Sequence, residues 1–231
     1  MFQVDSDKEE ENVPVRERFE NDLKSVQQDL LDLCNKSINA FELSFKAFLE
    51  KDIDLALEII EKDNEINRQE EMINDRVILL IAKQQPVATD LRRLMVIVKA
   101  SADMERVADF AVNIAKETIR IGKEPFITTT ETLEDMHFRT VSMLRQIVQA
   151  FVNEDTAKAK EIADLDDQVD ELYGDTVSNL LRLTSVATEN ISQITYLSFI
   201  ARYIERCADH ATNIAEHLFY LVKGQHYELN N

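Results

Sequence analysis

The amino-acid sequence predicts an all-α protein made of two tandem, repeated antiparallel three-helix bundles. The chain of 231 residues contains only three glycines and three prolines, too few for the turns of an all-β fold. Hydrophobic residues make up 45% of the chain and charged residues 30%, which suits amphipathic helices around a substantial core. The third observation is an internal repeat, because residues 105–115 and 205–215 carry the same pattern.

The repeated segment returns Glu, Arg, Ala, Asp, Ala, Asn, Ile and Ala in register, without a gap. Its copies read Glu105-Arg106-Val-Ala-Asp109-Phe-Ala-Val-Asn113-Ile-Ala and Glu205-Arg206-Cys-Ala-Asp209-His-Ala-Thr-Asn213-Ile-Ala. A weaker match links Asp63-Asn-Glu-Ile66-Asn67 to Asp166-Asp-Gln-Val169-Asp170. Two matching segments in the same order indicate that each half of the chain has the same architecture.

In the first half, residues 1–14 are polar and acidic, and we expect a flexible arm. Apolar residues at 3-4 spacing then predict a helix over 15–50. Asp52 is the expected N-cap of a second helix, which runs to about Gln85 and stops at Pro86. A third helix is expected from about Thr89 to Gly122, so the first bundle covers 15–122.

The second half follows a linker at 123–130. It is indicated by Gly122-Lys-Glu-Pro125 and by the three threonines Thr128-Thr129-Thr130 that follow. Helices are expected over about 131–153, from an Asp155 cap to about Leu183, and over about 188–222, ended by Gly224. The second bundle therefore covers 131–224, and 225–231 form a tail. Short connections between long amphipathic helices favour antiparallel bundles.

Composition excludes several classes of function. The formal net charge of −18 repels phosphate backbones and disfavours nucleic-acid binding, whereas it suits a cation or a basic partner. Cys34 and Cys207 form no disulfide framework and are expected as reduced thiols in a cytoplasmic protein. The acidic N-terminus does not resemble a signal peptide, and no apolar run of about 18 residues predicts a membrane span.

Acidic side chains interrupt the apolar seams of four predicted helices at matched positions. On each of these helices the two side chains are spaced i, i+4. They therefore lie on one helix face, with their Cβ atoms about 5–6 Å apart. Carboxylates in a partly buried seam are costly unless they are neutralised, and a multivalent cation neutralises them. The candidate ligands are Asp63, Asn67, Glu105 and Asp109 in the first half, and Asp166, Asp170, Glu205 and Asp209 in the second.

The alternative is that these carboxylates form ordinary surface ion pairs. Arg106 precedes Asp109 by three residues, and Arg206 precedes Asp209 by three, which is the spacing of intrahelical pairs. An almost all-oxygen ligand set favours a hard cation such as Fe³⁺, Mn²⁺, Mg²⁺ or Ca²⁺ over structural Zn²⁺ or Cu⁺. His210 is adjacent to one ligand, but a lone histidine there is more often structural.

Other motifs are isolated. Glu134-x-x-His137 has the i, i+3 spacing of a di-iron helix motif, but it occurs once and is interpreted as surface chemistry. Cys207-x-x-His210 also lacks a second copy. The sequence contains no Gly-rich phosphate loop and no Ser/His/Asp set, so we do not expect an enzyme.

Two three-helix repeats with Glu-Arg-x-Ala-Asp-x-x-x-Asn-Ile in each third helix resemble the PhoU family of phosphate-uptake regulators. The resemblance covers nearly all of 15–224. It implies a six-helix fold, often dimeric, and pairs the ligands into one site per bundle, with iron clusters or Mn or Mg as candidate cofactors. Asn67 departs from the carboxylate pattern, which implies weaker metal binding at the first site. Positions that repeat with the ligands are candidates for supporting or partner contacts: Arg106, Arg206, Asn113 and Asn213.

The resemblance also implies a function. Such proteins repress phosphate uptake and phosphate-starvation signalling, as adaptors between a phosphate ABC transporter ATPase and a membrane sensor histidine kinase. A homodimer in the cytoplasm is therefore expected. Two alternatives stay open, namely a carboxylate-bridged metal redox or storage protein, and a metal-free helical scaffold.

Overall fold

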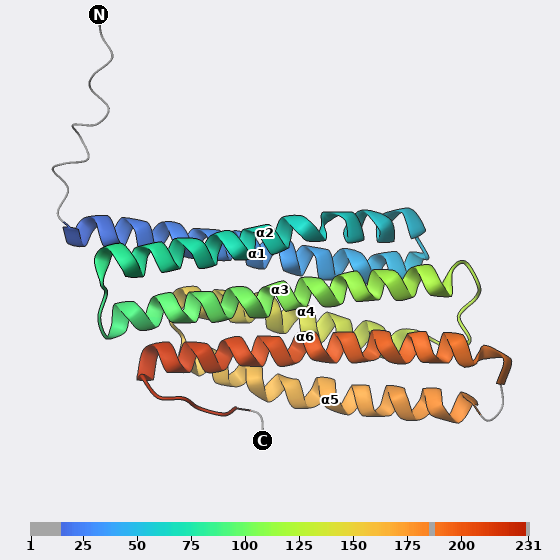
Figure 1. Ribbon diagram of the computed structural model, residues 1–231. Helices are drawn as coiled ribbons and strands as arrows, with labels where there is room; N and C mark the ends of the chain where they lie inside the picture. Colours follow the sequence, from blue (N-terminus) through green and yellow to red (C-terminus); the bar gives the residue numbers. More distant parts are fainter. Residues whose placement is uncertain (1–14, 185–187, 230–231) are drawn as a thin grey trace, which may run out of the picture.

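The computed structural model describes residues 15–184 and 188–229, which form six α-helices and one short 3₁₀ turn (Figure 1). The expected N-terminal arm at 1–14 lies outside the described residues, as do the last two residues of the expected tail. The elements in chain order are α1 (Val15–Glu50), α2 (Ile53–Gln84), α3 (Thr89–Ile121), α4 (Glu131–Asn153), α5 (Thr156–Thr184), η2 (Thr188–Asn190) and α6 (Ile191–Lys223).

The ends of the helices follow the predicted capping residues. Asp52 accepts a hydrogen bond from the Leu55 backbone N–H at 3.0 Å, and Asp155 accepts one from Lys158 at 3.0 Å. Gly122 and Gly224 have φ angles of 67° and 71° and end α3 and α6. The all-α, two-repeat architecture is thus confirmed, while the limits of the two bundles as separate domains stay predictions.

The two bundles meet along α3 and α6, which lie side by side in the middle of the molecule (Figure 1). α1 and α2 pack on α3, and α4 and α5 pack on α6. One continuous cluster of buried apolar side chains draws on all six helices, so the two repeats share a core. No helix in the described part of the chain is long and apolar enough to cross a membrane.

A buried carboxylate ties α3 to α6. Asp103 on α3 is 9% exposed, and its oxygens lie 2.8 Å from His210 Nδ1 and 3.0 Å from His217 Nε2. Asn213 also donates to it, at 3.3 Å. Burial raises the pKa of Asp103, but the bonds to His210 and His217 outweigh it and leave the pKa below its ordinary value. His210, a marginal ligand candidate, therefore makes a contact between the repeats.

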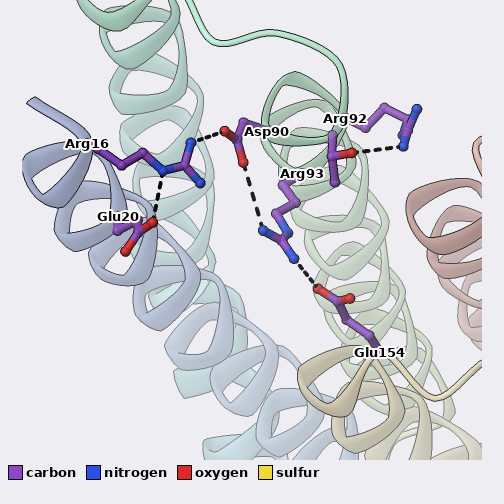
Figure 2. Close-up of polar contacts among 7 residues, drawn as sticks. Arg16, Glu20, Asp90, Arg92, Arg93 and Glu154 are labelled. Atoms are coloured by element: carbon purple, nitrogen blue, oxygen red, sulfur yellow. Dashed lines mark hydrogen bonds and ion pairs between the residues drawn. The ribbon is translucent and has the colours of Figure 1, made fainter.

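Ion pairs at one end of the molecule connect α1, α3 and the end of α4 (Figure 2). Asp90 lies 2.5 Å from Arg16 and 3.9 Å from Arg93, which in turn lies 3.1 Å from Glu154. Each pair is partly exposed to solvent and contributes little to stability by itself. Together these ion pairs link the first repeat to the second at the end of the molecule where α1 begins.

The interpretation of Glu134 and His137 as surface chemistry is wrong for the histidine. His137 stacks on Phe45 with ring centroids 4.2 Å apart and also contacts Phe41 at 4.7 Å. Glu134 instead accepts a hydrogen bond from Thr130 at 2.6 Å. Burial lowers the pKa of His137 to about 4, so its ring is a neutral part of the α1–α4 contact.

The partly buried ring of His137 predicts a stability that depends on pH. Its pKa is lower in the folded chain than in the unfolded chain, so the unfolded chain binds the extra proton between about pH 6.5 and 4. The contribution is complete above pH 6.5 and is lost as pH falls, by about 1.4 kcal/mol per pH unit. We expect His137→Phe to remove this dependence, measured as the difference in urea-unfolding free energy between variant and wild type.

The matched control is His226→Phe, which replaces an exposed ring beside Tyr220 in the C-terminal tail. An equal pH-dependent difference in that variant, or none in His137→Phe, would contradict the assignment.

Candidate functional site

The first predicted ligand set lies where α2 packs against α3. Asp63 and Asn67 lie one turn apart on α2, and Asn67 donates to Asp63 at 3.4 Å. Glu105 and Asp109 lie one turn apart on α3, and all four side chains are partly buried. The structure therefore brings the predicted residues of both helices to the same seam.

The carboxylates of this first set interact electrostatically. Burial and the neighbouring Asp109 both raise the pKa of Asp63. Burial and Asp109 also raise the pKa of Glu105, while Arg106 opposes the shift. Shifts of this kind mark a cluster of like charges in a partly desolvated place, which a cation stabilises.

Glu70 belongs to the same cluster but was missed as a candidate ligand. It adds to the raised pKa of Glu105 and accepts a hydrogen bond from Asn74 at 2.6 Å. The sequence pattern does indicate Glu70. It follows Asp63 by seven residues, so both lie in one row along the helix, and the residues at the two ends of that row are apolar. Its counterpart in the second repeat is Tyr173, and the absence of a repeated carboxylate hid it.

The second predicted set lies in the equivalent place, between α5 and α6. Asp166 is 2% exposed and accepts a hydrogen bond from Thr212 of α6 at 3.2 Å. Asp170 is exposed overall, but partial desolvation of its carboxyl, together with the neighbouring Asp209, raises its pKa. Both helices again contribute, which matches the pairing that the family resemblance implied.

Glu205 is the most perturbed carboxylate of the second set. It is 7% exposed, and burial and the neighbouring Asp209 raise its pKa to about 7. Arg202 opposes this shift through a short ion pair with Glu205, and its guanidinium also lies 5.6 Å from the Tyr173 ring. Arg202 has no counterpart that would have indicated it, because Ala102 occupies that position in the first repeat.

The residues expected to support the ligands differ in what they contact. Arg106 pairs with Asp109 at 2.9 Å and Arg206 with Asp209 at 3.2 Å, so the ion pairs of the alternative hypothesis are present. Both arginines are exposed. Asn213 donates to Asp103 rather than to a ligand, and Asn113 is partly buried in the corresponding place on α3.

The candidate ligand atoms are oxygens, which are the atoms that a hard cation prefers. Asp63 Oδ1, Asn67 Oδ1 and Glu205 Oε2 are buried and accept no hydrogen bond, which leaves oxygen lone pairs facing the seams. Among the described residues, however, no three Asp, Glu, His or Cys side chains converge closely enough to ligate one ion as they lie. Binding at either seam therefore requires side-chain rotation toward a shared point.

The fold and the paired seams define a class of protein: an all-α repeat protein with one acidic seam in each bundle. The PhoU domain model matches the chain twice, over residues 30–118 and 133–218. The chain belongs to the PhoU family, a family of regulatory accessory proteins rather than enzymes. The expected resemblance is confirmed.

Several relatives match the chain over nearly its whole length. The phosphate-specific transport system accessory protein PhoU homolog of Clostridium acetobutylicum is 34% identical over 94% of this chain and 99% of its own. The phosphate-specific transport system accessory protein PhoU of Escherichia coli is 31% identical over 94% and 90%. The crystal structure of the phosphate transport system regulatory protein PhoU from Streptococcus pneumoniae has a TM-score of 0.86 at 30% identity, covering 91% of this chain and 99% of that one.

The environment of Glu205 predicts an unusual titration. In protein freed of metal with a chelator, we expect the Glu205 carboxyl to titrate near pH 7, because burial and Asp209 disfavour its charged form. Carbon-detected NMR of the side-chain carboxyl measures this directly. Replacing Arg202 by Gln should raise the pKa further, since Arg202 stabilises the carboxylate.

The comparison variant is Arg145→Gln, which removes an arginine that pairs with Glu42 instead. A Glu205 that titrates at its ordinary value near 4.5, or that shifts equally in both variants, would overturn this account.

Proposed function

We propose that this protein is a negative regulator of phosphate uptake and phosphate-starvation signalling. It acts as a metal-binding adaptor between a phosphate ABC transporter and a sensor histidine kinase, as a homodimer in the cytoplasm. Membership of the PhoU family is the observation that carries this proposal, because its matched relatives are named for phosphate transport. The adaptor role and both partners come from the family resemblance.

Metal binding is the second part of the proposal. Asp63, Asn67, Glu105 and Asp109 would hold an ion at one seam, with Glu70 close by. Asp166, Asp170, Glu205 and Asp209 would hold one at the other. The clustered carboxylates and the buried oxygen atoms without partners support this reading, and iron, manganese or magnesium suits oxygen ligands.

A bound ion would change the physical state of each seam. It would neutralise the repelling carboxylates, lower their pKa values and hold α2 to α3 and α5 to α6. The protein's own contribution is to keep the carboxylates partly desolvated and to limit their rotation. An adaptor built this way presents a helical surface whose rigidity depends on the ion.

Elemental analysis tests the metal sites. In protein purified without chelator, we expect more than about one iron, manganese or magnesium ion per chain, since each bundle holds a carboxylate cluster. Glu105→Gln with Asp109→Asn should lose the ion of the first seam, and Glu205→Gln with Asp209→Asn that of the second. Each loss should be accompanied by a lower melting temperature.

The control is Glu61→Gln with Glu65→Gln, an exposed i, i+4 pair on α2. A wild type that neither contains nor takes up Fe³⁺, Mn²⁺ or Mg²⁺ would refute metal binding. If the seam variants keep or gain stability without any change in metal, the protein is a metal-free scaffold. Oxidase turnover of the iron-loaded protein would instead favour the redox alternative.

The regulatory role is tested in the source cell. Deletion of the gene should raise phosphate uptake and switch on a phosphate-starvation reporter in phosphate-rich medium, and the wild-type gene should reverse both. Pull-down with the transporter ATPase and with the kinase then separates the two proposed contacts. Normal uptake and a silent reporter in the deletion strain would rule out the role, whatever the metal content.

A further inference from the structure

A pocket interrupts the core of the first repeat where α1, α2 and α3 meet. It has a volume of about 160 Å³. Its apolar lining consists of Ala40, Leu43, Ile59, Ile66, Ala108 and Val112. Ile66 and Ala108 belong to the main core, whereas Ile59 and Val112 belong to a second, small cluster of buried side chains. The pocket therefore lies between two separate apolar clusters.

The second repeat shows no such division of its core among the described residues. Asp52 and Asp155 lie 103 residues apart, which relates α1 and α2 to α4 and α5, and the shift from α3 to α6 is 100 residues. The small cluster also contains three alanines, Ala47, Ala56 and Ala115. The counterparts of these alanines and of Ile59 all belong to the main core: Ala150, Ala159, Ala215 and Ile162.

The second repeat has its own pocket at the matched place, but with a different lining. It has a volume of about 180 Å³ and is lined by Phe138, Arg139, Ser142, Leu165 and Gln168. Met143 does not line it and is fully packed, with an exposed fraction of 0%, where the first repeat has the shorter Ala40. None of the described residues around this second pocket is acidic. It therefore lacks both the small residue and the carboxylates of the first pocket.

The first pocket contains a carboxylate oxygen without a hydrogen-bond donor. Asp63 and Glu65 are its acidic residues. In the second repeat the Thr212 hydroxyl donates to Asp166, the counterpart of Asp63, at 3.2 Å. Val112 stands in the place of Thr212 and has no donor to offer. Among the described residues, Asp63 Oδ1 is buried and accepts no hydrogen bond.

Two lysines also line the first pocket, but their ammonium groups bond to residues outside it. Lys36 Nζ donates to Gln69 at 2.6 Å, and Lys62 Nζ donates to Glu58 at 2.5 Å. Neither Gln69 nor Glu58 lines the pocket. The net charge of −18 also favours a cation over an anion near the surface.

We propose that this pocket binds a small organic cation, a primary amine with an apolar body. The body lies between Ile59 and Ile66, and the ammonium group donates to Asp63. A cavity of about 150 Å³ holds one benzene molecule, so a single six-membered ring fits. A carboxylate oxygen without a donor is costly, and an N–H group compensates for it where an apolar group does not. Binding requires neither a metal nor the proposed regulatory function, although Asp63 is shared with the first acidic seam.

The probe is benzylammonium, titrated by calorimetry into folded protein that a chelator has freed of metal. Benzyl alcohol and benzoate carry the same ring with a neutral and an anionic group. We expect saturable binding of one benzylammonium per chain, about tenfold tighter than benzyl alcohol, the size of one charged hydrogen bond. Benzoate should bind more weakly than the alcohol. Equal affinities, or tighter binding of benzoate, would overturn the proposal and leave the elemental analysis of the seams unaffected.

Replacing the carboxylate tests the charge preference. In Asp63→Asn, benzylammonium should fall to the affinity of benzyl alcohol, while the alcohol changes less than about twofold because the apolar lining remains. Asp75→Asn removes an exposed aspartate of the same helix outside the pocket and is the matched control. It should keep the wild-type preference, and a loss of preference in both variants would contradict a contact at Asp63.

Filling the pocket tests its location. Ala40→Met introduces the residue of the second repeat and should abolish binding of benzylammonium and of benzyl alcohol. Ala102→Met adds the same side chain at an exposed position of α3 and should bind like wild type. Circular dichroism melting checks that each variant folds, and undiminished binding by folded Ala40→Met would refute this location.

A measurement on wild type alone covers the case of a variant that fails to fold. The methyl NMR signals of Ile59, Ile66 and Val112 should shift with benzylammonium, while those of Ile162 and Val169 in the second repeat stay fixed. Shifts that do not saturate, or that spread equally over both repeats, would count against the proposed site.

Discussion

The packing of α3 against α6 is the constraint on which the rest of the molecule depends. These helices carry the third segment of each repeat, and their contact turns two three-helix units into one core. Phe110 lies 5.9 Å from Tyr203 and 5.8 Å from His210 across this contact. One face of each helix therefore packs against the other repeat, and the carboxylates lie on the face that packs against α2 or α5. Each acidic seam is therefore internal to its own bundle.

The two repeats keep one backbone plan while their side chains have diverged. The first seam has Asn67 and Glu70 where the second has Asp170 and Tyr173, and only the second has an arginine at position 202. Arg202 partly offsets the repulsion around Glu205, whereas the first seam has no such cation at the matching position. The two seams are thus chemically different sites, and an ion that binds one need not prefer the other.

Divergence outside the two seams has a different consequence. Asp103 has no carboxylate counterpart, because Tyr203 stands at the matching position of α6. Hydrogen bonds to two histidines compensate for the burial of this single carboxylate. α4 is also shorter than α1, with 23 residues against 36.

Most of the fold followed from local sequence signals. The helix ends were predicted within a few residues, because Asp52, Asp155, Gly122 and Gly224 act on neighbouring backbone groups. The exception is the start of α6, where the chain forms the η2 turn before Ile191. The eight predicted ligands were also brought to two seams, since their spacing and repetition were visible in the sequence.

Side chains that meet across helices were not predictable in the same way. Glu134 and His137 share a spacing typical of metal ligands. The ring of His137, however, packs against Phe41 and Phe45 of another helix. Glu70 and Arg202 lie beside the candidate ligands, but neither residue type recurs at the matching position of the other repeat. Periodicity and capping determine which face of a helix is apolar and where it ends, because both act over about four residues. Only the tertiary structure decided which residues of distant helices meet, since that depends on how the helices pack in three dimensions.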